Sequence, residues 1–383
     1  MRHGGWGALL GMAALSAACD GPYEAPCEVR SHQVALAAGF TPDLQVSGEG
    51  EVWAAGWQLD DDDDASTRLA GVATFTPAGA SLQQWVIPVP VLPTDVLGGE
   101  SPLQWAWTGE SLAAVRKITD VLPPDDDGEH LRSVLSLRSV APDGNAALPV
   151  QLLATSCIDC QLSWTMRALA GRVVVLYQPR ALTTDPEEPL EDGLTHYLIV
   201  DPAGQVLATG TLPGEPSDDD LGRFVVDPLG QGFWLSTAEG VVHFDRDMQW
   251  VAGPYAPGSE GPTPVESSGD AVHAAWSDDL DQVLQQSFAV DGSPLGRVER
   301  LTHGTAQAIR ATDRGIGVVA RDDGEAFFVW SVDGQKVGGD TLLPDIRGGW
   351  PALGALFVDG RHDYALFLGD KNQVDRLELS CER

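Results

Sequence analysis

Residues Arg321–Pro344, RDDGEAFFVWSVDGQKVGGDTLLP, contain the clearest pattern in the sequence. Residues 326–332 are mostly aromatic or β-branched, which favours a strand. Asp333 and Gly334 follow, and these residue types readily adopt the positive φ angles of a two-residue hairpin turn. Residues 336–343 then lead out as a second strand. The stretch therefore predicts a tight β-hairpin.

The same unit occurs at five other places in the chain. Each copy has an apolar strand, a turn rich in Asp, Pro and Gly, and a second strand; the copies are 71–88, 133–153, 197–213, 241–254 and 287–301. The later turns, at Gly204, Asp247, Gly292 and Gly334, are spaced about 40–45 residues apart, which is the repeat length of a four-stranded propeller blade. Earlier spacings are longer because polar insertions interrupt them.

A further strand precedes each hairpin, and this strand occurs seven times. The last unit ends at Arg383 before its fourth strand, whereas residues 29–37 form a lone strand near the other terminus. We expect 29–37 to complete the last blade by running antiparallel to 374–380. The sequence thus predicts an all-β protein, a single β-propeller with seven four-stranded blades closed by an N-terminal strand. Six to eight blades fit the spacing, and a linear β-solenoid with shorter repeats is the alternative.

Composition narrows the classes of partner. The 383 residues include 56 acidic and 23 basic side chains, for a net charge of −33. Nucleic-acid binding needs a basic surface to neutralise phosphates, so we expect no nucleic-acid partner. Docking on anionic lipid through a charged surface is equally disfavoured. The charge favours solubility, metal cations or basic partners.

The N-terminus has the pattern of an export signal. Arg2 and His3 precede an uncharged apolar run at 6–15, which is too short for a membrane-spanning helix. Leu15-Ser16-Ala17-Ala18-Cys19 then resembles the lipobox of bacterial lipoproteins, with the leucine one position further back than is usual. The resemblance implies that Cys19 becomes the lipidated N-terminus of the mature protein. Ordinary cleavage after Ala18 without a lipid is the alternative.

Cysteine counting agrees with lipidation. The chain has five cysteines, so four remain to pair if Cys19 carries lipid. Cys157 and Cys160 are close enough to form a local disulfide. Cys27 and Cys381 lie on the two sides of the turn that the closing blade lacks, so we expect the second disulfide there. A redox or zinc role for the C-x-x-C would need a helical setting or a second ligand pair, which the sequence does not have.

These features predict a signal peptide at 1–18, a lipidated tether at 19–28 and a β-propeller at 29–383. Over most of the mature chain, the repeat spacing resembles that of exported bacterial β-propeller lipoproteins. This resemblance implies a protein of the cell envelope, held at a membrane through its lipid anchor only, on the periplasmic or outer surface. We expect a monomer whose partner is an envelope protein or a glycan.

Runs of aspartate are the candidate metal ligands. In the expected blade order they lie in connections between the second and third strands, which share one face of the ring. Clustered carboxylates suit calcium, and the candidates are Asp60, Asp62, Asp64, Asp125 and Asp127. None of the runs has the ligand spacing of a known calcium loop. Solvated loops that keep the protein soluble are the alternative interpretation, and no other cofactor is expected.

No catalytic motif is present, neither H-E-x-x-H nor G-x-S-x-G in a strand–turn–helix setting. We therefore assign no catalytic residue and predict a binding or scaffolding module. The alternative is a propeller hydrolase or lyase with its site at the mouth of the central channel. His, Arg and carboxylate side chains that converge there would favour the enzyme.

Overall fold

The structure is a computed structural model of the chain. It describes residues 28–34, 40–46, 52–58, 67–75, 81–90, 104–108, 111–123, 130–140, 151–169, 171–181, 194–201, 203–212, 224–227, 229–237, 240–255, 263–312, 315–343, 352–359, 363–370 and 373–380.

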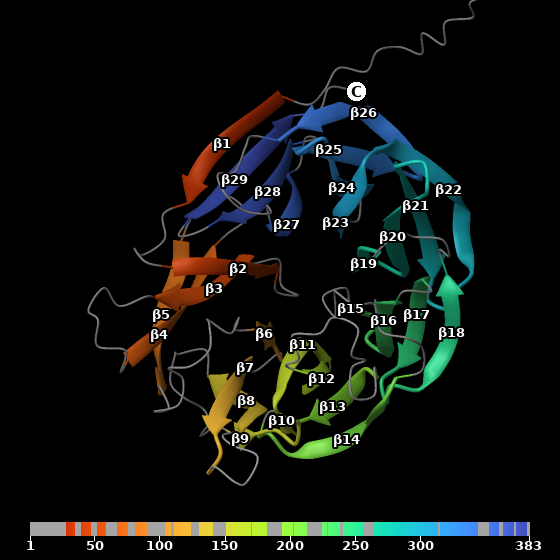
Figure 1. Cartoon of the computed structure of the whole chain (residues 1–383). Helices are drawn as coiled ribbons and strands as arrows, with labels where there is room; N and C mark the ends of the chain where they lie inside the picture. The colour runs from red at the N-terminus through yellow and green to blue at the C-terminus, as the bar shows by residue number, and fades with distance from the viewer. Residues whose placement is uncertain are drawn as a thin grey trace, which may run out of the picture.

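The described strands form seven antiparallel sheets arranged in a ring, as Figure 1 shows. Blade one contains β2 (Phe40–Val46), β3 (Val52–Gln58), β4 (Thr67–Phe75) and β5 (Ser81–Pro90). Blade two contains β6 (Gln104–Trp107), β7 (Leu112–Val121), β8 (Leu131–Val140), β9 (Gln151–Leu152) and β10 (Cys157–Ile158). Blade three contains β11 (Cys160–Leu169), β12 (Arg172–Ala181), β13 (His196–Val200) and β14 (Val206–Thr211).

Blade four contains β15 (Phe224–Val226), β16 (Gly232–Thr237), β17 (Gly240–Asp245) and β18 (Trp250–Tyr255). Blade five contains β19 (Val265–Ser268), β20 (Ala271–Ser277), β21 (Gln282–Ala289) and β22 (Pro294–His303). Blade six contains β23 (Thr305–Thr312), β24 (Gly315–Asp322), β25 (Glu325–Val332) and β26 (Gln335–Leu342). Blade seven contains β27 (Ala352–Asp359), β28 (Asp363–Asp370), β29 (Gln373–Ser380) and β1 (Glu28–Val34).

The ring closes as the sequence predicts. The N-terminal strand β1 pairs antiparallel with β29, from Glu28 opposite Ser380 to Val34 opposite Val374. This confirms the all-β propeller with seven blades and its closure by a strand from the other end of the chain. Cys27 and Cys381 lie outside the described residues, so their disulfide stays a prediction.

Turn chemistry explains the hairpin that repeats around the ring. In blade six, Asp333 and Gly334 both have positive φ, 51° and 70°, as the two central residues of this tight turn require. The turn connects β25 to β26 with Val332 opposite Gln335. The predicted hairpin at 321–344 is thereby confirmed.

Blade two departs from the regular pattern. Its expected outer strand is replaced by two segments of two residues each, β9 and β10, which both pair with β8. Side-chain and backbone hydrogen bonds hold the chain between them: Leu135 N donates to Thr155 Oγ1 at 2.9 Å, and Leu153 N donates to Leu135 O at 2.8 Å. The edge of β8 therefore keeps partners without a continuous fourth strand.

The hydrophobic core lies between blades rather than within one layer. One cluster, for example, joins Leu176 and Tyr197 of blade three to Phe233 and Phe244 of blade four. Similar clusters lie between blades two and three, four and five, five and six, and six and seven. Because successive side chains on a strand point to opposite faces, each blade supplies apolar residues to both of its neighbours.

The strands of each blade are named a to d outward from the ring axis. The a–b and c–d turns open on one side of the ring, which we call the c–d face. The b–c turns and the links between blades open on the other side, which we call the b–c face. No helix long and apolar enough to cross a membrane occurs in the part of the chain that the structure describes.

Candidate functional site

The five candidate metal ligands, Asp60, Asp62, Asp64, Asp125 and Asp127, all lie outside the described residues. Among the residues that the structure does describe, no group of three or more His, Cys, Asp or Glu side chains could hold a metal ion. The calcium site therefore stays a prediction.

Two described b–c turns show what aspartate does on that face. Asp278 Oδ1 accepts hydrogen bonds from the backbone N–H groups of Leu280 and Gln282, at 3.0 and 2.9 Å. Asp281 and Asp323 occupy positive-φ positions, at 53° and 46°, which aspartate tolerates better than most residues. In these turns aspartate stabilises the backbone.

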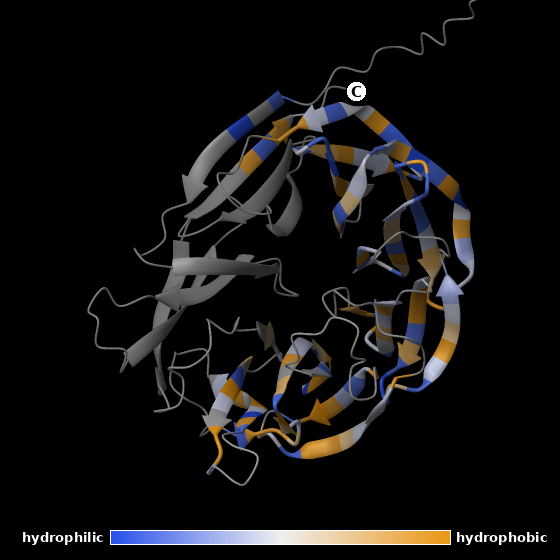
Figure 2. Ribbon diagram, viewed as in Figure 1, coloured by the Kyte–Doolittle hydropathy of each residue, from blue (hydrophilic) through white to orange (hydrophobic). Residues whose placement is uncertain are grey.

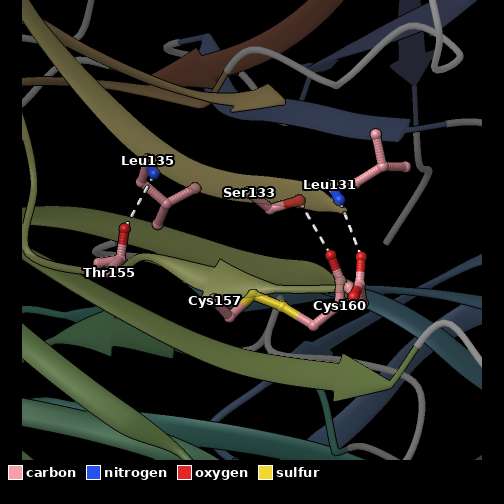
Figure 3. The surroundings of a disulfide bond; sticks show 7 residues. Leu131, Ser133, Leu135, Thr155, Cys157 and Cys160 are labelled. Carbon is pink, nitrogen blue, oxygen red and sulfur yellow. Dashed lines mark hydrogen bonds between the residues drawn. A yellow bond between two sulfur atoms is a disulfide. The ribbon is translucent and has the colours of Figure 1, made fainter. Parts of the chain in front are cut away.

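The Cys157–Cys160 disulfide is present, as predicted. Cys157 belongs to β10 at the outer edge of blade two, whereas Cys160 is the first residue of β11, the innermost strand of blade three. Figure 3 shows how hydrogen bonds surround the link. Ser133 Oγ donates to Cys160 O at 2.9 Å, and Leu131 N donates to Asp159 Oδ1 at 2.8 Å. The disulfide therefore links the outer edge of blade two covalently to the innermost strand of blade three.

A polar cluster lies on the innermost strands of blades five and six, next to the ring axis (Figure 1). Arg310 Nη1 on β23 lies 3.1 Å from Glu266 Oε2 on β19, and the two side chains keep 28% and 23% of their exposure. Arg310 Nη1 also donates to the carbonyl of Ile309 at 2.8 Å. The ion pair thus connects two blades beside the axis.

His273 lies behind this ion pair, on the second strand of blade five. Its ring is buried, with both nitrogens hydrogen-bonded to serines: Nδ1 lies 2.8 Å from Ser287 Oγ, and Nε2 lies 3.0 Å from Ser268 Oγ. Burial lowers the pKa of His273 from 6.5 to about 4, because removing water disfavours the charged imidazolium. The ring is therefore neutral at pH 7.

The contacts of this cluster extend from blade five to blade six. Ser268 Oγ lies 3.5 Å from the carbonyl oxygen of Thr312 in blade six, longer than a normal O–H···O hydrogen bond. A neutral ring donates at one nitrogen and accepts at the other, so the tautomer of His273 decides which serine donates to it. Ser287 Oγ in turn accepts from Gln285 Nε2 at 3.1 Å. The contacts end on the backbone of the next blade, and they join the two blades.

A second buried histidine lies in blade four. His243 Nε2 on β17 lies 3.1 Å from Asp227 Oδ2, and the two side chains are 7% and 0% exposed. The ring stacks on Trp234 with 4.7 Å between centroids. Burial lowers the pKa of His243, while Asp227 and Asp245 oppose that shift. This pair is enclosed between blades and away from solvent.

The sequence did not identify the polar cluster around Glu266, His273 and Arg310 as a candidate site. A hairpin register would have placed Glu266 opposite His273, as the structure does. The partner of Glu266 is 44 residues further along the chain, however, and only the packing of one blade on the next brings the two together. Ser268 and His273 also lie in no recognised sequence motif.

Comparisons with known proteins identify no family for this chain. No protein-family model matches the chain, and no match was found among curated proteins. A chain of the mitotic checkpoint complex is 11% identical, with 100% of both chains covered and a TM-score of 0.49. A structure from a study of two prolyl endopeptidases is 13% identical over 88% of this chain but 45% of that chain, with a TM-score of 0.43. AofleA from Arthrobotrys oligospora is 13% identical, over 83% and 90% of the two chains, also with a TM-score of 0.43.

Proposed function

We propose that the protein is an exported, lipid-anchored β-propeller of the cell envelope that binds or scaffolds an envelope protein or a glycan and performs no catalysis. The observation that supports a non-catalytic role most is the set of hydrogen-bond partners around His273. Both ring nitrogens are hydrogen-bonded to serine hydroxyls, those of Ser268 and Ser287, whereas the histidine that activates a nucleophilic serine is oriented by a carboxylate.

The neighbouring charges support the same proposal. Glu266 and Arg310 neutralise each other across the seam between blades five and six. His273 has a pKa of about 4, far below the operating pH at which a general base is most effective. The polar groups that the structure places beside the axis therefore serve to hold two blades together.

A serine-reactive phosphonate probe tests this reasoning. We expect the wild-type protein and the Ser268→Ala variant to show the same low labelling, because Ser268 is not activated. A labelled adduct that mass spectrometry maps to Ser268, and that disappears in the variant, would overturn the non-catalytic proposal.

That adduct would support the second candidate, a propeller hydrolase. One observation favours it: the 3.0 Å contact between Ser268 Oγ and His273 Nε2 has the length of a nucleophile–base hydrogen bond. In such an enzyme His273 would accept the Ser268 proton, and Arg310 would stabilise negative charge. Loss of hydrolysis in both Ser268→Ala and His273→Gln, with the fold intact, would distinguish it from the binding module.

The proposed membrane location can be tested independently of the polar cluster around His273. We expect the full-length protein, expressed in a bacterium, to fractionate with membranes and to carry lipid on Cys19. The Cys19→Ala variant should be released into the soluble exported fraction. Equal partitioning of the two proteins would contradict lipidation.

A further inference from the structure

The place where the chain enters the ring determines which side of the ring faces a lipid anchor. Strand β1 begins with Glu28 opposite Ser380, the last residue of β29. Since β29 is the third strand of blade seven and β1 the fourth, Glu28 lies at the c–d face. Any tether that precedes Glu28 therefore joins the propeller at that face.

The tether is short compared with the depth of the ring. Cys19 and Glu28 are separated by nine residue steps, which span at most about 30 Å when fully extended. Strand β1 has seven residues and is about 23 Å long. Placing the b–c face on the membrane would use most of the tether merely to run back along β1. A lipid on Cys19 therefore favours contact through the c–d face.

A second and independent feature lies on the same face, on the far side of the ring. Exposed apolar side chains gather where the outer strands of blades three to five begin and in one a–b turn of blade four. They are Val206 (40% exposed), Leu207 (46%), Leu229 (55%), Trp250 (46%), Val251 (52%) and Leu295 (46%). The b–c face also exposes apolar side chains, among them Ile158 (55%), Leu280 (69%) and Leu342 (52%), so the tether and Trp250 are what distinguish the c–d face. Figure 2 shows hydrophobic positions on the outer strands β14, β18 and β22 of these blades. Tryptophan is enriched where proteins meet the membrane interface.

We propose that the c–d face of the propeller rests on a lipid surface with zwitterionic headgroups, held by the tether at blade seven and by the apolar side chains of blades three to five. This inference rests on the lipid anchor of the proposed function and adds an apolar contact to it, whereas the sequence alone predicted attachment through the anchor only. Contacts on opposite sides of one face would lay the ring flat on the bilayer and direct the b–c face, with its aspartate turns, toward the solvent.

The charges on the c–d face determine which lipid headgroups this face can approach. The c–d face carries exposed carboxylates in its turns, among them Asp247, Asp270, Asp291 and Asp333, with Arg246 as an exposed cation beside them. Anionic headgroups would repel these carboxylates. Zwitterionic headgroups have no net charge, and they leave the apolar contact as the attractive contribution.

Energy transfer from a probe on each face to labelled lipid tests the orientation. A fluorescent non-natural amino acid replaces Gln231 in an a–b turn of the c–d face, or Asp279 in a b–c turn. Each lipidated protein is reconstituted in phosphatidylcholine vesicles that contain an acceptor-labelled lipid. We expect stronger energy transfer from position 231 than from position 279. Equal transfer, or stronger transfer from position 279, would overturn the proposed orientation.

Matched variants test the apolar contact. Leu229→Ser with Trp250→Ser should reduce energy transfer from position 231, whereas Leu280→Ser, which removes a 69% exposed leucine from a b–c turn, should leave it unchanged. Adding phosphatidylglycerol should also reduce it. No change in the Leu229→Ser, Trp250→Ser variant would contradict the contact. Failure of the anchor would look different: wild type and Cys19→Ala would then bind the vesicles equally.

Discussion

The seam between blades three and four and the seam between blades five and six are built from different chemistry. The first contains aliphatic and aromatic side chains, including Leu176, Phe233 and Phe244. The second also has an apolar part, which includes Ala275, Val283 and Val318. Toward the c–d face it contains the chain of hydrogen bonds around His273.

The blades of this propeller are therefore joined in two ways. Apolar burial is non-directional and does not depend on the protonation of any group. The stability that the seam between blades three and four contributes should therefore not change with pH. Hydrogen bonds fix register but depend on protonation. We therefore expect the seam between blades five and six to be sensitive to pH and the other to be insensitive.

The largest effect is expected from the apolar seam. Phe233 is fully buried and stacks on Phe224 with 4.9 Å between ring centroids. Phe233→Ala should lower the free energy of unfolding by about 3–5 kcal/mol, through lost burial and a residual cavity. Urea denaturation measures it. Leu229→Ala, at a 55% exposed position, is the control and should cost less than about 0.5 kcal/mol. Equal costs for the two changes would contradict the assignment of this seam as core.

The next effect is the pH dependence of the polar seam. The pKa of His273 is about 4 in the folded protein and 6.5 without burial, so between these values the unfolded chain binds the proton more readily. Stability is therefore lost as pH falls from 6.5 toward 4, by up to about 3 kcal/mol.

Because carboxylates also titrate in this range, the measurement is a difference between two proteins. Wild type and His273→Gln are unfolded in urea at several pH values, and wild type should lose more stability than the variant below pH 6.5. Parallel curves would show that the ring of His273 titrates normally. His273 would then not be buried as the structure describes.

A smaller effect is expected at the covalent seam between blades two and three. The Cys157–Cys160 bridge closes a loop of only a few residues, for which the chain-entropy model allows about 2 kcal/mol. Hydrogen bonds from Ser133 and Leu131 hold the same segment. The Cys157→Ser, Cys160→Ser variant should therefore fold, with its melting temperature lowered by a few degrees. Failure of this variant to fold would mean that the hydrogen bonds alone cannot hold the segment.

The smallest effect is expected from the Glu266–Arg310 pair, because both side chains are partly solvated. A double-mutant cycle with Glu266→Gln and Arg310→Gln should give a coupling energy of about 1 kcal/mol or less. The coupling should shrink in high salt. A coupling several times larger that does not depend on salt would point to a desolvated, functionally strained pair.

Local patterns determined the architecture before any packing was known. Apolar strands, Asp-Gly turns such as Asp333-Gly334 and the spacing of the repeats predicted the propeller and favoured seven blades among six to eight. The missing last strand predicted the closure by β1, and the short C-x-x-C spacing predicted the disulfide. These succeed because hairpins and turns depend on residues close together in the chain.

How the blades join and where each polar group lies depend on tertiary packing. Ser268 and His273 are neighbours within blade five, but they reach Thr312 and become buried only when blade six packs on blade five, and the pKa of His273 follows from that burial. The apolar residues at the start of β14, β18 and β22 are unremarkable in the sequence; the ring places them on the same face as Glu28. Contacts between residues far apart in the chain depend on the relative placement of whole blades, and no local pattern records that placement.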